Sequence, residues 1–185
     1  MTVAEIGASS YRRFQQDREA LLDQILIHYS DALVRFCYSL VHHAAAAEDL
    51  AAESIAIVLT KHKYFADEAH LRAYLYQIAH HKAMDYLRHN KQFVPLEDVE
   101  NVLGSGDVEK DALRKERNQG IYRCMQALPE QYRQVLQLQY FDGFAVSDIC
   151  AITKKTPKQV YNLLARGKAS LKELLVKEGI THEDL

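Results

Sequence analysis

The sequence predicts an all-α protein. Of its 185 residues only 7 are Gly and 3 are Pro, too few for the many tight turns of an all-β fold. Alternating strand patterns are hard to find, whereas the helix formers Ala, Leu, Gln, Lys and Glu are abundant. With 48% hydrophobic residues the chain can bury a core, and its length suits one medium domain or two small ones.

Three helices are expected in the first half of the chain. The first covers residues 11–40, with a break near Ser30-Asp31. The second runs from about Ala45 to His62, and a tight loop at 64–67 separates it from a third helix over about 68–90. Residues 22–92 are therefore predicted to form one helical domain, preceded by an N-terminal extension over residues 1–21.

The second half is expected to form another helical domain. Residues 93–107 break the helical pattern and are acidic, which predicts a linker. The domain at 108–178 then holds a helix ending near Leu128, one starting at Pro129, a break at Asp142-Gly143 and a short helix near 147–152. A final helix follows, and the tail at 179–185 is expected to be frayed.

The final helix has a marked start and a strong charge bias. Thr156 can cap its free N–H groups, and Pro157 suits the first helical position. Between Thr153 and Lys172 there are six cations and no acid, although the whole chain has a net charge of −2. The apolar residues of this helix fall on one side: Val160, Leu163, Leu164 and Leu171. Such a helix can lie against a polyanion while its apolar side holds it to a small domain.

The final helix forms a helix-turn-helix candidate together with the short helix before it and the turn that joins them. Such units place their second helix in the DNA major groove. Asn162 and Arg166 can hydrogen-bond bases or phosphates, and the lysines suit phosphates. The alternative is an ordinary solvated cationic helix. The lysines concerned are Lys154, Lys155, Lys158 and Lys168.

Two other segments suggest binding surfaces. The third helix mixes aromatic rings with His80-His81-Lys82 and the basic run 88–91, a combination that suits unpaired nucleotides. The alternative is that the rings pack in the core and the charges are solvated. An acidic turn at 47–53 can dock on a basic protein surface, or it can be a solvated helix start.

Catalysis, metal binding and membrane insertion are not expected. The nine histidines form no His-x-x-x-His pattern, and there is no phosphate-binding glycine loop or nucleophile elbow. Cys37, Cys124 and Cys150 match no metal spacing and are expected to be buried free thiols in a reducing cytoplasm. No secretory signal is visible at residues 1–10, and no apolar run is long enough to span a membrane.

The motifs together resemble a known family. The segments Ala47–Glu53, Leu71–Ala79 and Asp85–Arg88 resemble region 2 of bacterial sigma factors. The segment Ala127–Leu136, with the helix-turn-helix through Leu171, resembles region 4. Their order, the acidic segment between them and the size of the chain resemble the extracytoplasmic-function group of the sigma-70 family.

The resemblance implies that the chain binds core RNA polymerase and promoter DNA, with no cofactor and no catalysis of its own. It implies contacts to the −35 duplex from Thr156, Lys158, Tyr161, Asn162, Ala165, Arg166 and Lys168. It implies contacts to the −10 strand from Phe65, Tyr74, His81, Asp85 and Arg88. The implied polymerase contacts are Asp49, Leu50 and Glu53. The family also often uses an anti-sigma factor as a partner.

Several positions depart from the family pattern. Ala52 stands where Gln is common, and Tyr74 stands where Trp is common. His80-His81 replaces Arg-Asn, so His81 is expected to donate a hydrogen bond to a flipped base whose identity differs from the usual one. Lys154 stands where the turn often contains Gly, and a positive φ there would cost about 1 kcal/mol.

The sequence therefore predicts a promoter-specificity subunit of RNA polymerase. Two alternatives stay open at this point. One is a helix-turn-helix regulator that binds operator DNA without polymerase, and the other is a helical adaptor that binds only proteins.

Overall fold

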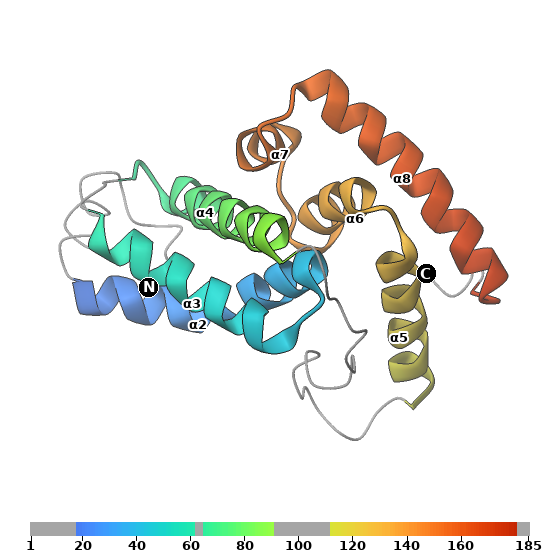
Figure 1. The fold of residues 1–185 in the computed structure, drawn as a ribbon, viewed down its shortest axis with the longest axis horizontal. Helices are drawn as coiled ribbons and strands as arrows, with labels where there is room; N and C mark the ends of the chain where they lie inside the picture. The colour runs from blue at the N-terminus through green and yellow to red at the C-terminus, as the bar shows by residue number, and fades with distance from the viewer. Residues whose placement is uncertain (1–17, 62–64, 91–111, 181–185) are drawn as a thin grey trace. The chain divides into compact units, whose positions relative to one another are not determined.

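The computed structural model describes residues 18–61, 65–90 and 112–180, and these residues form helices joined by short turns, with no strand among them (Figure 1). The predicted all-α class is confirmed. The chain divides into two units between Val102 and Leu103, except that Ala151–Thr153 group with the first unit. Three predicted segments lie outside the described residues: the linker, residues 1–17 of the extension and residues 181–185 of the tail.

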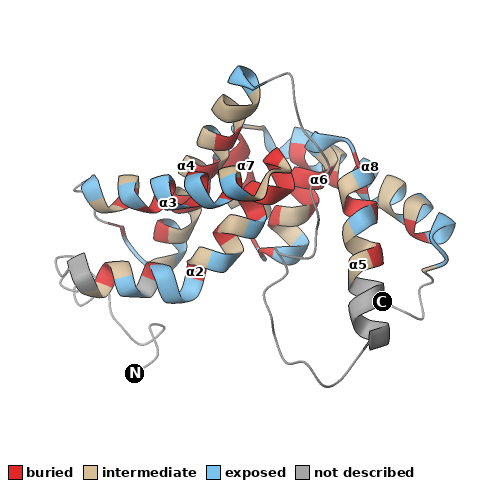
Figure 2. Ribbon diagram, turned by 60° about the horizontal axis from the view of Figure 1, so that its bottom comes forward, coloured by how far each residue is buried: buried red, intermediate tan, exposed pale blue. Residues whose placement is uncertain are grey.

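The first unit is a bundle of three helices: α2 (Arg18–Val41), α3 (Ala44–Thr60) and α4 (Glu68–His89). Each helix packs against the other two. Their apolar sides are buried and their polar sides are exposed, as the alternating colours along each ribbon show (Figure 2). In the core the rings of Phe36 and Tyr76 lie 5.0 Å apart between centroids. The Tyr29 hydroxyl donates a hydrogen bond to Glu68 and so ties α2 to the start of α4.

The predicted break near Ser30-Asp31 is wrong, because α2 continues through it. Ser and Asp favour helix ends over helix interiors. Here the buried residues on both sides, including Tyr29 and Leu33, stay in helical register, so the packing of one continuous stripe outweighs the local preference.

Two histidines that the sequence left without a role make the turn between α2 and α3. His42 adopts φ 53°, a left-handed conformation that ends α2, and its N–H bonds the Tyr38 carbonyl at 2.9 Å. His43 caps α3, because its Nδ1 accepts from the Ala46 N–H at 3.1 Å. The His42-His43 pair therefore closes one helix and opens the next.

The start of α4 is capped by an acid. Oδ1 of Asp67 accepts from the His70 N–H at 2.9 Å and lies 2.7 Å from the His70 ring nitrogen. The backbone hydrogen bond from His70, followed by the bond from its ring, lowers the pKa of Asp67. The expected loop before α4 is confirmed over residues 65–67, while 62–64 lie outside the described residues.

The second unit contains α5 (Ala112–Ala127), α6 (Glu130–Leu136), a π-helical turn η3 (Gln137–Phe141), α7 (Val146–Thr153) as far as Cys150, and α8 (Pro157–Lys177). These bounds confirm the predicted break at Asp142-Gly143. Arg133 of α6 is buried, and its Nη1 donates to the carbonyls of Gln126 and Leu128 at 2.9 and 3.1 Å. Burial lowers the pKa of this guanidinium, and its hydrogen bonds satisfy carbonyls at the end of α5.

Both ends of α8 are fixed. Oγ1 of Thr156 accepts from the Gln159 N–H, and Oε1 of Gln159 accepts from the Thr156 N–H at 2.8 Å, which is a complete capping box with Pro157 at the first position. The predicted cap is therefore confirmed. At the other end Gly179, with φ 76°, closes the helix, and the N–H of Ile180 bonds the Leu175 carbonyl at 2.9 Å.

The C-terminal end of α8 is also attached to α5. A Cβ built on Gly120 would lie 2.7 Å from Cδ1 of Ile180, so the chain just after α8 approaches α5 closely where a side chain is absent. Arg123 and Glu178 form an exposed ion pair at 3.6 Å beside this contact. Residue 180 therefore belongs to the folded unit, although the tail was predicted to fray after Gly179.

Gly167 sets the distance between α8 and α6. It is buried, and a Cβ at this position would lie 3.2 Å from Cδ1 of Leu136 and 3.2 Å from Cβ of Tyr132. These distances leave no room for a longer side chain. Together with the buried Val160 and Leu164, Gly167 determines which side of α8 faces α6 and which side faces solvent.

The turn between α7 and α8 has the strained conformation that the sequence raised as a possibility. Lys154 adopts φ 54° and ψ 36°, the left-handed region that favours Gly. Its N–H bonds the Cys150 carbonyl, and so does the N–H of Lys155 at 3.2 Å. This turn therefore has the helix-ending shape that the usual Gly allows, with a lysine in its place.

The three cysteines are free, and two of them are buried as predicted. Burial raises the pKa of the Cys37 thiol to about 12, and burial also raises the pKa of Cys124. The prediction fails for Cys150, which is only half-buried, because it lies on α7 next to the exposed turn of the helix-turn-helix.

We expect Lys154→Gly to raise the free energy of unfolding by about 0.5–1 kcal/mol, because Gly relieves the left-handed strain while its greater unfolded-state freedom offsets part of the gain. Urea unfolding measures this. The control is Lys155→Gly, which removes the same charge where φ is not positive and should lower stability. Equal effects of the two variants would contradict the assignment of strain to Lys154.

We expect Gly167→Leu to lower the free energy of unfolding by about 1–3 kcal/mol, because the larger side chain must push Leu136 and Tyr132 apart. The matched control is Ala169→Leu, two residues along on the exposed side of the same helix. If both variants unfold at the same urea concentration, close packing at Gly167 is not what holds α8.

Candidate nucleic-acid and polymerase interfaces

The solvent-facing side of α8 carries most of the predicted −35 contacts. Lys and Arg side chains occur along the helix, and its only acid, Glu173, lies in its C-terminal half. Tyr161 is 61% exposed, so this large ring is offered to solvent. The predicted contacts on this side are all exposed: Lys158, Tyr161, Asn162, Ala165, Arg166 and Lys168. Cations on an exposed helix side can replace the counterions of DNA phosphates.

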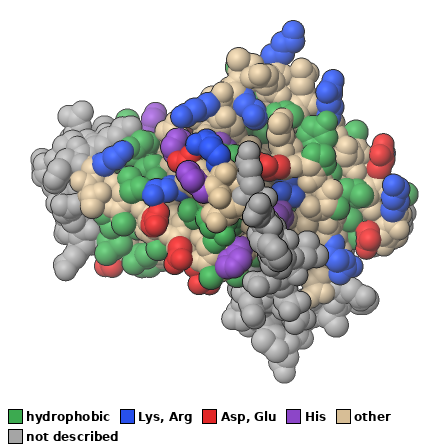
Figure 3. All heavy atoms as spheres, in the orientation of Figure 1, with side chains coloured by type: hydrophobic (Ala, Val, Ile, Leu, Met, Phe, Trp, Pro, Cys, Tyr) green, Lys and Arg blue, Asp and Glu red, His purple; other side chains and the backbone are tan. Residues whose placement is uncertain are grey.

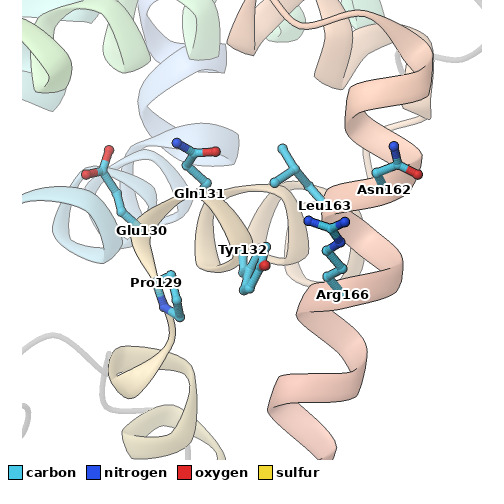
Figure 4. A pocket seen from close by; sticks show the side chains of 7 residues that line it. All are labelled: Pro129, Glu130, Gln131, Tyr132, Asn162, Leu163 and Arg166. Atoms are coloured by element: carbon cyan, nitrogen blue, oxygen red, sulfur yellow. The ribbon is translucent and has the colours of Figure 1, made fainter.

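Asn162 and Arg166 border an open cleft between α8 and the start of α6. The cleft has a volume of about 400 Å3, and Pro129, Gln131 and Tyr132 line its other side. Tyr132 and Arg166 both point into the space between the two helices (Figure 4). The two polar side chains with the strongest predicted role in base reading therefore lie together at one edge of α8, on its surface and not in the core.

Two predicted −35 residues have contacts within the protein. The hydroxyl of Thr156 accepts the capping hydrogen bond from Gln159, so it fixes the start of α8. Nζ of Lys168 lies 5.1 Å from the ring centroid of Tyr140 on η3, a cation–π contact. Tyr140 is 52% exposed, so this contact leaves the ammonium group near the surface.

On α4 the predicted −10 residues form one linked row. Nδ1 of His81 lies 3.2 Å from Oδ2 of Asp85, and Nη1 of Arg88 lies 2.9 Å from Oδ1 of the same carboxylate. The three side chains are spaced at i, i+4 and i+7, so they share one side of the helix. His, Lys and Arg side chains gather over α4 on the face that Figure 3 shows.

The aromatic part of the predicted −10 surface differs from the expectation. Phe65 is only 5% exposed, and its ring lies 5.3 Å from that of half-buried Tyr74. Phe65 therefore supports Tyr74 in this conformation and offers no free face for stacking on a base. Its apolar ring, placed just before α4, gains more from burial than from exposure.

The predicted polymerase-docking turn on α3 is only partly exposed. Asp49 and Glu53 face solvent, whereas Leu50 is 7% exposed and anchors the turn in the core. Nζ of Lys82 on α4 donates to Oε2 of Glu53 at 2.7 Å. This ion pair connects the docking turn to the helix that carries the −10 row.

Several residues of these surfaces were missed by the sequence analysis. Gln159 could have been found, because Thr-x-x-Gln before an apolar run is a capping-box pattern. Tyr140 and Tyr132 could not, because the residues beside them lie far away in the sequence and only the fold brings them together. The pairing of Lys82 with Glu53 could not be foreseen for the same reason.

Within the part of the chain that the structure describes, no three His, Cys, Asp or Glu side chains gather closely enough to hold a metal ion. Over the same residues, no helix combines the length and the apolar character needed to cross a membrane.

Two family profiles match the sequence in chain order. The profile of Sigma-70 region 2 matches residues 25–93, which include α3 and α4. The profile of Sigma-70 region 4 matches residues 118–171, which include the helix-turn-helix. Together they cover about two thirds of the chain.

Curated relatives cover nearly the same span. The ECF RNA polymerase sigma factor SigM of Bacillus subtilis is 26% identical over 155 residues, 83% of this chain and 94% of that protein. SigW of the same organism, also an ECF RNA polymerase sigma factor, is 26% identical over 171 residues, 86% of this chain and 90% of that protein.

A solved structure has a similar fold. The sigma factor RpoE of Bartonella quintana, crystallised with the anti-sigma factor NepR, superposes with a TM-score of 0.66 at 22% identity, covering 83% of this chain and 95% of that one. The two profiles, the order in which they occur and the curated relatives agree. The chain belongs to the sigma-70 family of RNA polymerase sigma factors, in its extracytoplasmic-function group.

Proposed function

We propose that this sigma factor directs core RNA polymerase to promoters by reading the −35 duplex with α8 and holding the melted −10 strand on α4. The observation that carries the proposal is the two-sided character of α8. Its apolar side is buried against α6, and its exposed side offers cations, an amide and a guanidinium directly after a helix-turn-helix turn. That arrangement suits a major groove.

The roles proposed for α8 and α4 follow from the chemistry of their exposed side chains. Arg166 and Asn162 can hydrogen-bond base edges and are the proposed readers on α8, while Lys158 and Lys168 suit phosphates. On α4, half-buried Tyr74 and exposed His81 and Arg88 suit an unpaired strand, since rings stack on splayed bases and cations hold the backbone. Trapping unstacked bases shifts the equilibrium toward the open duplex, because the closed duplex does not offer them. RNA synthesis itself belongs to the polymerase.

We place the polymerase contact on the exposed carboxylates of the α3 turn. Asp49 and Glu53 face solvent there and can pair with a basic protein surface. The net charge of −2 argues that the free chain binds DNA weakly, so that polymerase supplies most of the affinity. The chain would act in the cytoplasm, where it meets polymerase and the chromosome. By analogy with the complex of RpoE and NepR, an anti-sigma factor is a further proposed partner.

The direct test is transcription in vitro with purified core polymerase over a promoter library. A sigma factor should give initiation at a subset of promoters only when both proteins are present. An ordinary helix-turn-helix regulator would instead bind duplex operator DNA unaided and add no initiation to core polymerase.

We expect Arg166→Ala to weaken promoter binding by the reconstituted holoenzyme by about 1–3 kcal/mol if the guanidinium makes a bidentate contact to a guanine. Binding to promoter variants at each −35 position measures this, and the loss should concentrate at one position. Lys177→Ala, in the last turn of α8, is the control and should leave base preference unchanged. Unchanged binding by Arg166→Ala would remove Arg166 from the readout.

We expect the double variant Asp49→Ala, Glu53→Ala to assemble poorly with core polymerase while remaining folded. Removing Glu53 breaks its exposed ion pair with Lys82, which contributes only about 0–1 kcal/mol to stability. A pull-down with tagged polymerase measures assembly, and circular dichroism checks the fold. Glu48→Ala, which removes a neighbouring exposed acid, is the control, and normal assembly of the double variant would refute the assignment.

A further inference from the structure

The carboxylate of Asp85 is positioned to control the two predicted DNA contacts beside it on α4. One oxygen lies 3.2 Å from Nδ1 of His81, and the other accepts a hydrogen bond from Nη1 of Arg88 at 2.9 Å. Both oxygens are therefore directed along the helix toward these partners. On α3, which packs against α4, Glu53 bonds Lys82, so it does not compete for His81.

The distance between Asp85 and His81 favours one position for the proton on His81. An ionised carboxylate can only accept a hydrogen bond, so a hydrogen bond between the two side chains requires the proton to be on Nδ1 of His81. When the ring is neutral, Nε2 is then unprotonated. The His81 side chain is 61% exposed, so solvent and ligands meet a hydrogen-bond acceptor. This differs from the expectation drawn from the sequence, in which His81 donates a hydrogen bond to the base.

We propose that Asp85 is a positioning residue that acts through His81 and Arg88, and that neutral His81 accepts a hydrogen bond from a base of the captured strand. This inference rests on the proposed function of α4. The ligand chemistry it implies is an unpaired base that offers an amino group on its Watson–Crick edge, which is adenine, cytosine or guanine and excludes thymine.

The charge of Asp85 makes this role distinguishable from direct binding. A carboxylate near DNA repels phosphates, so removing it should leave the overall affinity for a strand unchanged or increase it. Removing a positioning residue should at the same time reduce the discrimination between bases, because His81 is no longer held in one tautomer. Replacing a residue that itself contacts DNA would lower the affinity. Replacing a residue needed only for the fold would lower both the affinity and the discrimination between bases.

The first measurement is nitrogen NMR of the free chain labelled with 15N-histidine, at a pH where the ring is neutral. The His81 signals, assigned with His81→Gln, should show a protonated Nδ1 and an unprotonated Nε2. In Asp85→Ala the ring should shift toward the tautomer protonated at Nε2. A wild-type His81 already protonated at Nε2 would overturn the inference, and this result needs no polymerase.

The second measurement uses holoenzyme and single-stranded oligonucleotides that span the −10 element of the best promoter from the library. Each adenine is replaced in turn by purine, each cytosine by 2-pyrimidinone and each guanine by hypoxanthine, which removes only the amino group. One replacement should weaken wild-type binding roughly two- to tenfold, the range expected for one neutral hydrogen bond. That sensitivity should vanish in His81→Ala and decrease in Asp85→Ala, whose overall affinity should not fall.

The outcomes separate this inference from the proposed function. If no amino group matters to the wild-type holoenzyme, or if Asp85→Ala keeps the full sensitivity, the inference is wrong although promoter-directed transcription stands. If Asp85→Ala binds every strand more weakly with its discrimination intact, Asp85 is a direct contact. If the holoenzyme does not initiate at promoters, the proposed function fails, and the NMR result alone decides whether Asp85 sets the tautomer.

Discussion

The close packing of α8 on α6 is the constraint on which the DNA-binding surface depends. A helix with cations and apolar residues can rotate about its own axis unless its packing fixes one side. Here Gly167 lets α8 approach Leu136 and Tyr132, and the buried stripe around Val160 locks the rotation. Arg166 is then directed to the surface next to the start of α6. The readout surface is therefore a property of two helices and not of the recognition helix alone.

The two nucleic-acid surfaces differ in how their charges are used within the protein. No ion pair links Lys158 or Arg166 to an acid among the described residues, so these cations are available to phosphates and bases. On α4 the charges of Lys82 and Arg88 are already paired with Glu53 and Asp85. Binding by α8 should therefore depend strongly on salt, whereas capture of a strand by α4 depends more on stacking and on oriented hydrogen bonds.

Helices, breaks and caps could largely be predicted from the sequence, because periodicity and capping are local. The start at Thr156 and the break at Asp142-Gly143 are examples. Packing could not be predicted locally, which is why α2 continues through Ser30-Asp31 and why Phe65 is buried. The sequence pointed to the residues of the candidate sites but not to their pairings, since Glu53 and Lys82 lie 29 positions apart and meet only in the folded bundle.

At Lys154 the local preference for Gly in a left-handed turn is not followed, and a cation lies at the surface instead. Gly would adopt the left-handed conformation of this position at less cost, and the lysine lowers the free energy of unfolding by about 1 kcal/mol. Lys154 also adds one positive charge to a turn that already holds Lys155, directly before the helix proposed to enter the major groove. Each cation that meets a phosphate releases a counterion, and the gain appears only when DNA is bound. At Lys154, a backbone strain that lowers the stability of the free protein is therefore combined with a charge that can strengthen DNA binding.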